Sequence, residues 1–167
     1  SEELTDKLAQ VDIYNGMANR FLWAYVQRRS LLADPTQIPE SAIDGLVKQL
    51  GKRILAAREV GRVQRSQPAR NEWRELYPQR AGMGLPPRVA AVTERADAQQ
   101  LRLQLIFAAL DGKHAIRVPH VHAAKYVWEY CEESALYLFG ESTGNRKLDK
   151  VLAALRGGRR LTQNHIR

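Results

Sequence analysis

The sequence predicts a mainly α-helical fold: a helical bundle with at most one short strand pair, followed by a truncated winged-helix or helix-turn-helix start. Apolar residues recur at helical spacing over most of the 167 residues. Only the run FLWAYV at 21–26 has the aromatic and β-branched content of a strand. With 44% hydrophobic and 26% charged residues, the chain can bury a core and has the composition of a folded domain.

The elements of the first half are bounded by glycine and proline. We expect a short helix at residues 2–10 and a strand at 21–26. The strand is expected to end before Arg28 and Arg29. After a loop containing Pro35 and Pro39, a helix is expected from about 40 to 60. We expect any strand pair to join residues 21–27 to residues 62–66. The helical stripe of this first long helix contains Ile43, Leu46, Val47, Leu50, Ile54 and Ala57.

Three further helices are expected before the C-terminal region. The first covers 69–78, the second covers about 87–111 and the third covers 119–139. Leucines and isoleucine occur on most sides of the second helix, so we expect it at the centre of the bundle. Pro87 suits the first turn of that helix, and Asp111-Gly112 closes it. The third helix has a stripe of small and large apolar residues: Val121, Ala124, Trp128, Cys131, Ala135 and Leu138.

The charge balance points to an anionic partner. There are 26 Lys and Arg residues against 18 Asp and Glu, which gives a formal net charge of +8, and 19 of the cations are arginine. A basic chain of this kind is expected to bind DNA weakly, through phosphates and without sequence preference. The single Cys131 allows no internal disulfide, so we expect a cytoplasmic protein, and no apolar run is long enough for a membrane span. The acidic start SEELTDKL is not expected to be a signal peptide.

Motifs that would mark a complete enzyme do not occur in the sequence. It contains no glycine-rich phosphate loop, no GxSxG, no HExxH and no CxxC pair. We therefore expect the chain to be non-catalytic by itself, with no cofactor and no metal site. His120 and His122 are two residues apart and do not share a helix face, so His120 is expected to be a structural residue of a helix first turn.

A row of arginines is the first candidate site. Arg88, Arg95 and Arg102 are seven residues apart, which would place them on one face of a continuous helix. One interpretation is structural, with each guanidinium paired to a carboxylate such as Glu129 or Asp97. The other is that the row faces a bound phosphate.

Two further sets of cations are candidates. Arg20 directly precedes the predicted strand, where a rigid base would hold it. The C-terminal pattern of a leucine-rich helix, GGRR and LTQNHI is typical of the first two elements of a helix-turn-helix, whose recognition helix would follow Arg167. A solvated basic face is the alternative. The cations that would touch DNA phosphates here are Lys147, Lys150, Arg156, Arg159 and Arg160.

In the order of these elements, the chain resembles the C-terminal third of an AAA+ replicative helicase. The segment GMANRFLWAYVQRRS at 16–30 is similar to an arginine-finger segment, and residues 95–130 are similar to the lid of the minichromosome-maintenance branch. A family of helicase-like proteins of plasmids and phages shares the order of a GFANRFLW-like segment, W..LYP, RA-x5-RL, YCEESA..LFG and a winged-helix start.

The resemblance implies catalytic roles for two arginines, in trans or together with a motor domain. Arg20 would be the finger that reaches a neighbouring subunit's nucleotide, and Arg95 would be the lid sensor that touches the γ-phosphate. It also implies ATP and Mg²⁺ for the parent protein, and self-association of that parent. The phosphate loop, the metal-binding acidic strand and the first sensor are expected to precede Ser1.

The resemblance implies three stretches: a remnant of an ATPase core at 1–38, a lid-like helical domain at 39–140, and a linker with the start of a winged helix at 141–167. The function expected first is the DNA-associated C-terminal region of a helicase-like P-loop ATPase of mobile-element replication. The alternatives are a free-standing basic DNA-binding helical protein and a protein-interaction module. An in-frame phosphate loop encoded upstream of Ser1 would favour the first.

Overall fold

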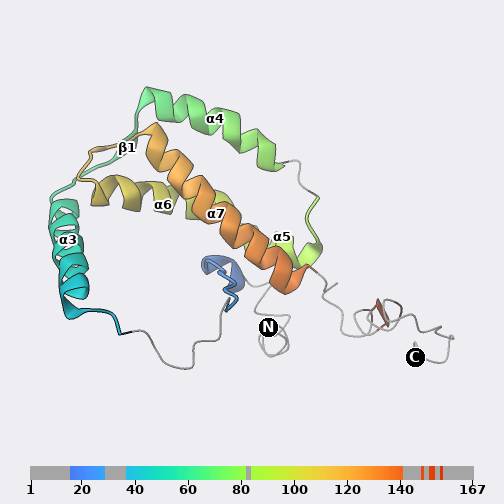
Figure 1. The fold of residues 1–167 in the computed structure, drawn as a ribbon. Helices are drawn as coiled ribbons and strands as arrows, with labels where there is room; N and C mark the ends of the chain where they lie inside the picture. Colours follow the sequence, from blue (N-terminus) through green and yellow to red (C-terminus); the bar gives the residue numbers. More distant parts are fainter. Residues whose placement is uncertain are drawn as a thin grey trace. The chain divides into compact units, whose positions relative to one another are not determined.

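The computed structural model describes residues 16–28, 37–81 and 84–140, together with 148, 151, 152 and 155. Over these residues the fold is mainly helical, with one short strand pair, as the sequence predicts (Figure 1). The helix expected at 2–10 lies outside the described residues.

The described residues belong to two compact units. Unit 1 contains residues 16–25, 84–96 and 129–140. Unit 2 contains residues 26–28, 37–81 and 97–128. The long helix α7 (Val118–Phe139) contributes its first half to unit 2 and its second half to unit 1.

Unit 2 contains the only strand pair of the described residues. Strand β1 (Gln64–Arg65) pairs in parallel with β2 (Ala115–Ile116), and Gln64 lies opposite Ala115. Strand β1 lies within the segment 62–66 expected to join any strand pair, but its partner is β2, so the expected pairing with residues 21–27 is wrong. The helices of unit 2 are α3 (Glu40–Arg58), α4 (Gln67–Ala81), most of α6 (Ala96–Leu110) and the first half of α7.

The core of unit 2 is built on the strand pair and on small residues. Ala69, Ala108, Ile116 and Val121 are all buried and in contact, with Trp73 packed against their edge. Helix α6 ends at a glycine-dependent turn. Gly112 has a φ of 61°, a backbone conformation in which a residue with a side chain would be strained. Lys113 N–H then donates to the carbonyl of Ala108 at 2.9 Å.

Helix α6 buries glutamines and alanines most deeply, whereas the leucines expected to be central are only partly buried or exposed. Gln100 and Gln104 are 3% and 0% exposed, whereas Leu101 and Ile106 are 38% and 51% exposed. The hydrophobic residues of α6 lie all around the helix, so their pattern does not predict which face is buried. The elements of unit 2 that pack against α6 determine the buried face.

Unit 1 packs the 3-10 helix η1 (Ala18–Arg20) and the short helix α5 (Pro87–Thr93) with the second half of α7. Pro87 occupies the first turn of α5, as expected. Gly16 enters η1 with φ of 81°, a conformation that favours glycine. The buried cluster of unit 1 consists of Ala18, Val89, Val92, Ala135 and Phe139.

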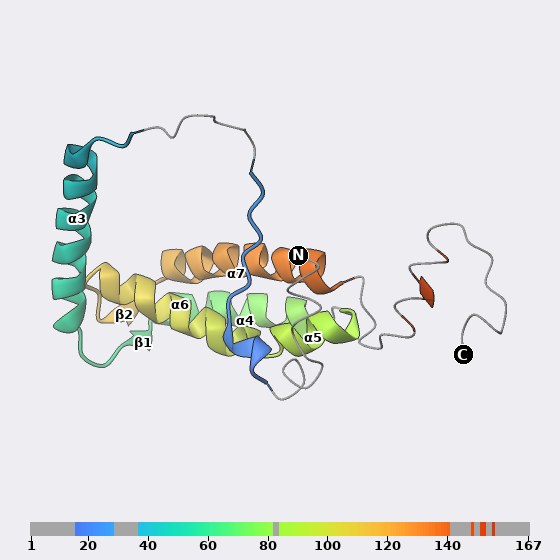
Figure 2. The same ribbon diagram turned by 90° about the horizontal axis from the view of Figure 1, so that it is seen from below.

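The strand expected at 21–26 does not form. The segment crosses α7 in a conformation without regular secondary structure, and side chains satisfy its backbone (Figure 2). Tyr25 N–H donates to Ser134 Oγ at 3.0 Å, and the Tyr130 hydroxyl donates to the Tyr25 carbonyl. Trp23 also donates from Nε1 to the Ala18 carbonyl at 3.1 Å. Because these groups take the place of a strand neighbour, the aromatic run needs no sheet.

The helix expected over 87–111 is two helices. It is interrupted at Glu94 and Arg95, between α5 and α6. The Thr93 hydroxyl donates to the Val89 carbonyl at 2.7 Å, one turn back, a bond that bends helices by competing with the backbone ladder. The interruption separates Arg88 from Arg102.

The apolar stripe expected on α7 is confirmed for most of its length. Val121, Ala124, Trp128, Cys131 and Ala135 are buried. Burial raises the pKa of the Cys131 thiol, as expected of a core cysteine.

Candidate arginine site

Arg20 and Arg95 come from adjoining positions in unit 1. Their sequence neighbours Asn19 and Glu94 are joined by a hydrogen bond, in which Asn19 Nδ2 donates to Glu94 Oε2 at 3.0 Å. Arg20 ends η1, Arg95 lies in the turn between α5 and α6, and both are exposed.

The base under these two arginines is well packed. Asn19 is 3% exposed, and Ala18 beside it belongs to the buried cluster with Val89 and Val92. A hydrogen bond made from a buried amide holds the turn at Glu94 against η1. Sequence reasoning missed Asn19 and Glu94 as positioning residues, although each stands next to a candidate arginine.

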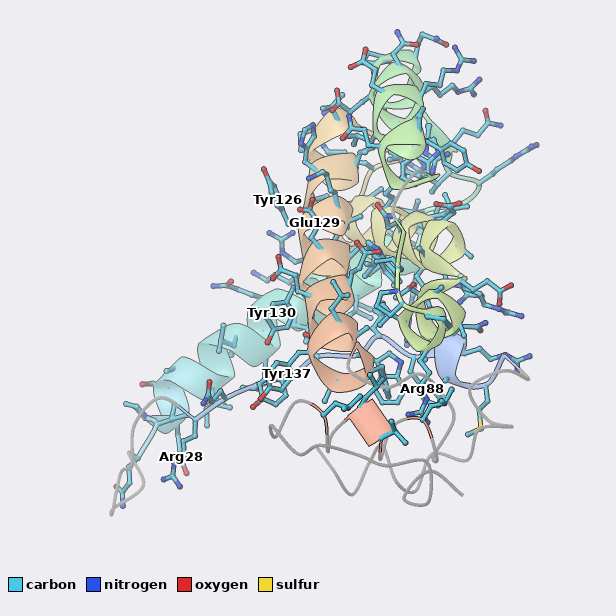
Figure 3. All side chains as sticks on the ribbon, turned by 90° about the vertical axis from the view of Figure 1, so that its right-hand side faces the viewer. Arg28, Arg88, Tyr126, Glu129, Tyr130 and Tyr137 are labelled. Atoms are coloured by element: carbon cyan, nitrogen blue, oxygen red, sulfur yellow. The ribbon has the colours of Figure 1, made fainter. Side chains whose placement is uncertain are left out.

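The expected row of three arginines on one helix face is wrong. Arg88 is buried within α5, with 8% of its surface exposed, whereas Arg95 is exposed in the turn that follows. Helix α5 ends at Thr93 and α6 begins at Ala96, so the seven-residue spacing no longer implies a shared helix face. In Figure 3, Arg88 lies on the opposite side of α7 from Tyr130 and Tyr137.

Arg102 is also placed differently from the expectation. The structural interpretation of the row gives each arginine a carboxylate partner, but Arg102 is exposed on α6 and donates to the amide oxygen Gln99 Oε1 at 3.4 Å. The neutral partner and the exposure make this a weak contact. Arg102 therefore serves as a surface control for Arg95.

A second polar cluster, in unit 2, links α3 to the start of α7. Arg53 Nη1 donates to Asp111 Oδ1 at 2.8 Å, and Asp111 Oδ2 lies 3.3 Å from His120 Nε2. His120 is 6% exposed, and its Nδ1 accepts the backbone N–H of Arg117 at 3.1 Å. Because Nδ1 accepts, the neutral ring carries its proton on Nε2 and donates it to Asp111. The structural role expected for His120 in a helix first turn is confirmed.

Asp111 makes the stability of unit 2 dependent on pH. The hydrogen bond from Arg53 lowers the pKa of the Asp111 carboxyl, with a smaller contribution from His120, and outweighs its partial burial. A lowered folded-state pKa adds stability that is present at neutral pH and lost as the pH falls through it. We expect Asp111→Asn to cost about 1 kcal/mol at pH 7, because the carboxylate is half exposed. Urea unfolding of both proteins measures this difference.

The difference between Asp111→Asn and the parent chain should shrink as the pH falls below about 4, where the unfolded-state carboxyl takes up its proton. Glu75→Gln on the exposed side of α4 is the control, and its effect should be near zero at every pH. A difference for Asp111→Asn that is as large at pH 3 as at pH 7 would contradict this assignment.

The second histidine of the pair has a separate partner. His122 Nε2 lies 3.0 Å from Glu72 Oε1 on α4, whereas His120 faces Asp111. The described residues contain no group of three or more side chains that could hold a metal ion.

A third cluster joins β1, α4 and α6 in unit 2. Arg65 Nε donates to Gln104 Oε1 at 2.9 Å, and its guanidinium carbon lies 4.6 Å from the centre of the Trp73 ring. Burial, and then the charge of Arg70, lowers the pKa of Arg65. Arg65 can only donate, so Gln104 must present its oxygen to it, and this fixes α6 against β1. These residues come from three separate elements, and nothing in their spacing along the sequence predicts that they meet.

The basic residues expected to touch DNA phosphates near the C-terminus lie outside the described residues. They are Lys147, Lys150, Arg156, Arg159 and Arg160.

No family model, curated protein or solved structure matches this chain. Within the described ranges, none of the helices has the length and apolar character that crossing a bilayer requires.

Proposed function

We propose that unit 1 presents Arg20 and Arg95 to a nucleotide polyphosphate, within a helicase-like P-loop ATPase of mobile-element replication. The observation that carries the proposal is the 3.0 Å hydrogen bond between Asn19 and Glu94, which brings together the backbone positions next to the two arginines. Two exposed guanidinium groups on a packed base are the chemistry that binds phosphate oxygens and stabilises charge on a transferring phosphoryl group.

The residues present fit one part of such a site. Exposed arginines suit phosphate oxygens. The described residues hold no cluster for Mg²⁺, so the metal and the β-phosphate would be held by other parts of the parent ATPase. The step assigned to this chain is electrostatic: Arg20 and Arg95 donate hydrogen bonds to phosphate oxygens and offset their negative charge.

The proposal is tested by titrating the chain with inorganic tripolyphosphate at low salt while following backbone amide signals by NMR. We expect shifts centred on residues 17–22 and 93–97. Arg20→Ala and Arg95→Ala should each weaken binding about tenfold, because each removes a charge-assisted hydrogen bond donor. The Tm of Arg95→Ala should stay nearly unchanged, since the side chain is exposed.

The matched control is Arg102→Ala, another exposed arginine, which should leave tripolyphosphate affinity unchanged. Arg95→Lys keeps the charge but not the planar donor fork, so its affinity should fall between those of the parent chain and Arg95→Ala. Shifts that lie wholly outside unit 1, or equal losses for Arg95→Ala and Arg102→Ala, would refute the proposal.

The net charge of +8 favours a second candidate function, weak binding to DNA that is insensitive to sequence. Binding through about four phosphates should weaken by about two orders of magnitude between 50 and 200 mM salt. Titration of two unrelated duplexes at both salt concentrations measures it. A clear preference for one duplex, or an affinity that salt does not change, would argue against this function.

A further inference from the structure

Helix α3 exposes its whole apolar stripe. None of its 19 residues is buried, and six large apolar side chains are 41% to 68% exposed. Those of the stripe are Ile43, Leu46, Val47, Leu50 and Ile54. Their spacing of three and four residues places them on one face, which we call the α3 stripe. A contiguous apolar face of this kind on a helix usually marks an interaction surface.

The contacts that attach α3 to unit 2 are made beside the stripe. Arg53 bonds to Asp111 and to the Leu110 carbonyl, and the side chain of Ala56 lies close to Gly112. Both contacts are in the C-terminal part of α3. Figures 1 and 2 agree that this end of α3 approaches the rest of unit 2, whereas its other turns stand apart. The attachment therefore positions the stripe without covering it.

The sequence of α3 is poorly suited to a helix without a packing partner. Gly45 and Gly51 lie within it, and glycine disfavours helix interiors. Amphipathic helices of this length draw most of their stability from packing of the apolar face. Gly51 lies beside Val47 on the flank of the stripe, and a Cβ at Gly51 would meet nothing within 4 Å. A small residue at that place lets a second helix approach closely.

The charges along α3 select the partner. Its first turns carry Glu40 and Asp44, and its later turns carry Lys48, Lys52 and Arg58. Two copies of α3 that run parallel would place like charges together at both ends. Two antiparallel copies would place the acidic end of each beside the basic end of the other.

We propose that the α3 stripe is a self-association surface on which a second copy of this chain docks its own α3 in antiparallel orientation. An alignment that places Ile43 opposite Ile54 of the second copy also places Val47 opposite Leu50. The same alignment brings Glu40 beside Arg58 at both ends, because these two residues share one flank of the stripe. The interface is symmetric, so every contact occurs twice.

The test is the concentration dependence of mass, measured by sedimentation equilibrium of the chain at low salt. We expect a dimer. Val47→Lys should raise its Kd by about a hundredfold, because an apolar side chain is lost from the contact in both copies. Glu40→Arg alone and Arg58→Glu alone should each raise Kd by about tenfold, through repulsion at both ends. The double variant Glu40→Arg with Arg58→Glu should return Kd to about the original value, because the two pairs form again with exchanged signs.

Gln49→Glu is the control, because it adds a charge on the same helix, on the side away from the stripe, and should change Kd least. Circular dichroism of each variant shows whether its helix content is unchanged. If Val47→Lys lowers the helix content, the charge variants still test the proposal, because they replace exposed side chains. A monomeric mass at every concentration overturns the proposal. If stripe variants then lower the stability of that monomer, another segment of the same chain covers α3. A dimer that Val47→Lys does not weaken, or charge variants that the double change does not rescue, also overturns it.

Discussion

Phe139→Ala should destabilise the chain by about 3–5 kcal/mol, because it removes the largest fully buried side chain among the described residues of unit 1. Phe139 is 0% exposed and belongs to the cluster with Val89, Val92 and Ala135. Its ring also meets Trp23 edge to face, with 5.2 Å between ring centres. Truncation leaves a cavity next to η1, which carries Arg20. Urea unfolding followed by tryptophan fluorescence measures the loss.

The matched control is Phe21→Ala, which removes the same side chain at a position that is 52% exposed in the same unit. Its cost should stay below about 1 kcal/mol. Comparable losses for Phe21→Ala and Phe139→Ala would contradict the packing described for unit 1. A loss for Phe139→Ala below about 1 kcal/mol would do the same.

Ile116→Ala should cost about 2–5 kcal/mol, since Ile116 is 1% exposed at the centre of unit 2. Its side chain packs on Ala69, Ala108 and Val121, small residues that leave little material to fill a cavity. Its backbone carbonyl accepts the N–H of Ser66 at 2.9 Å, so the strand pair positions the side chain. The loss should appear as a lower urea midpoint with an unchanged slope.

Ile106→Ala is the control for this position. Ile106 is the same residue type in the same unit, but it is 51% exposed on α6. We expect a cost of at most about 1 kcal/mol. If Ile106→Ala proved as costly as Ile116→Ala, then α6 would bury the side that carries Ile106, and the buried position of Gln104 on its other side would be wrong.

Much of the helical content could be predicted from the sequence. The bounds of α3 follow from Pro39 before its first residue and the apolar stripe along it, and α7 follows from its longer stripe. These signals are local, since helix periodicity, proline and glycine act within a few residues. For the same reason Gly112 marks the end of α6 in the sequence and in the structure.

The candidate site was predictable only in part. Arg20 stood out before the predicted strand and Arg95 within the arginine row, but nothing local joins Asn19 to Glu94, which are 75 residues apart. The shared face of Arg88, Arg95 and Arg102 failed because the prediction assumed an unbroken helix. The Thr93 hydroxyl donates to the Val89 carbonyl and so competes with a backbone N–H for that acceptor. Residue spacing does not show which of the two donors binds.

The sequence by itself determined most of the helical segments among the described residues, the buried stripe of α7 and the basic, arginine-rich character of the chain. The tertiary structure decided the rest. It pairs residues 64–65 with residues 115–116 and buries Gln104 against Arg65. It also gives the backbone of the 21–26 segment hydrogen bonds to the side chains of Tyr130 and Ser134 in place of a neighbouring strand. The physical reason is that a strand or a buried amide takes its state from whichever groups satisfy its hydrogen bonds, and here those groups come from distant parts of the chain.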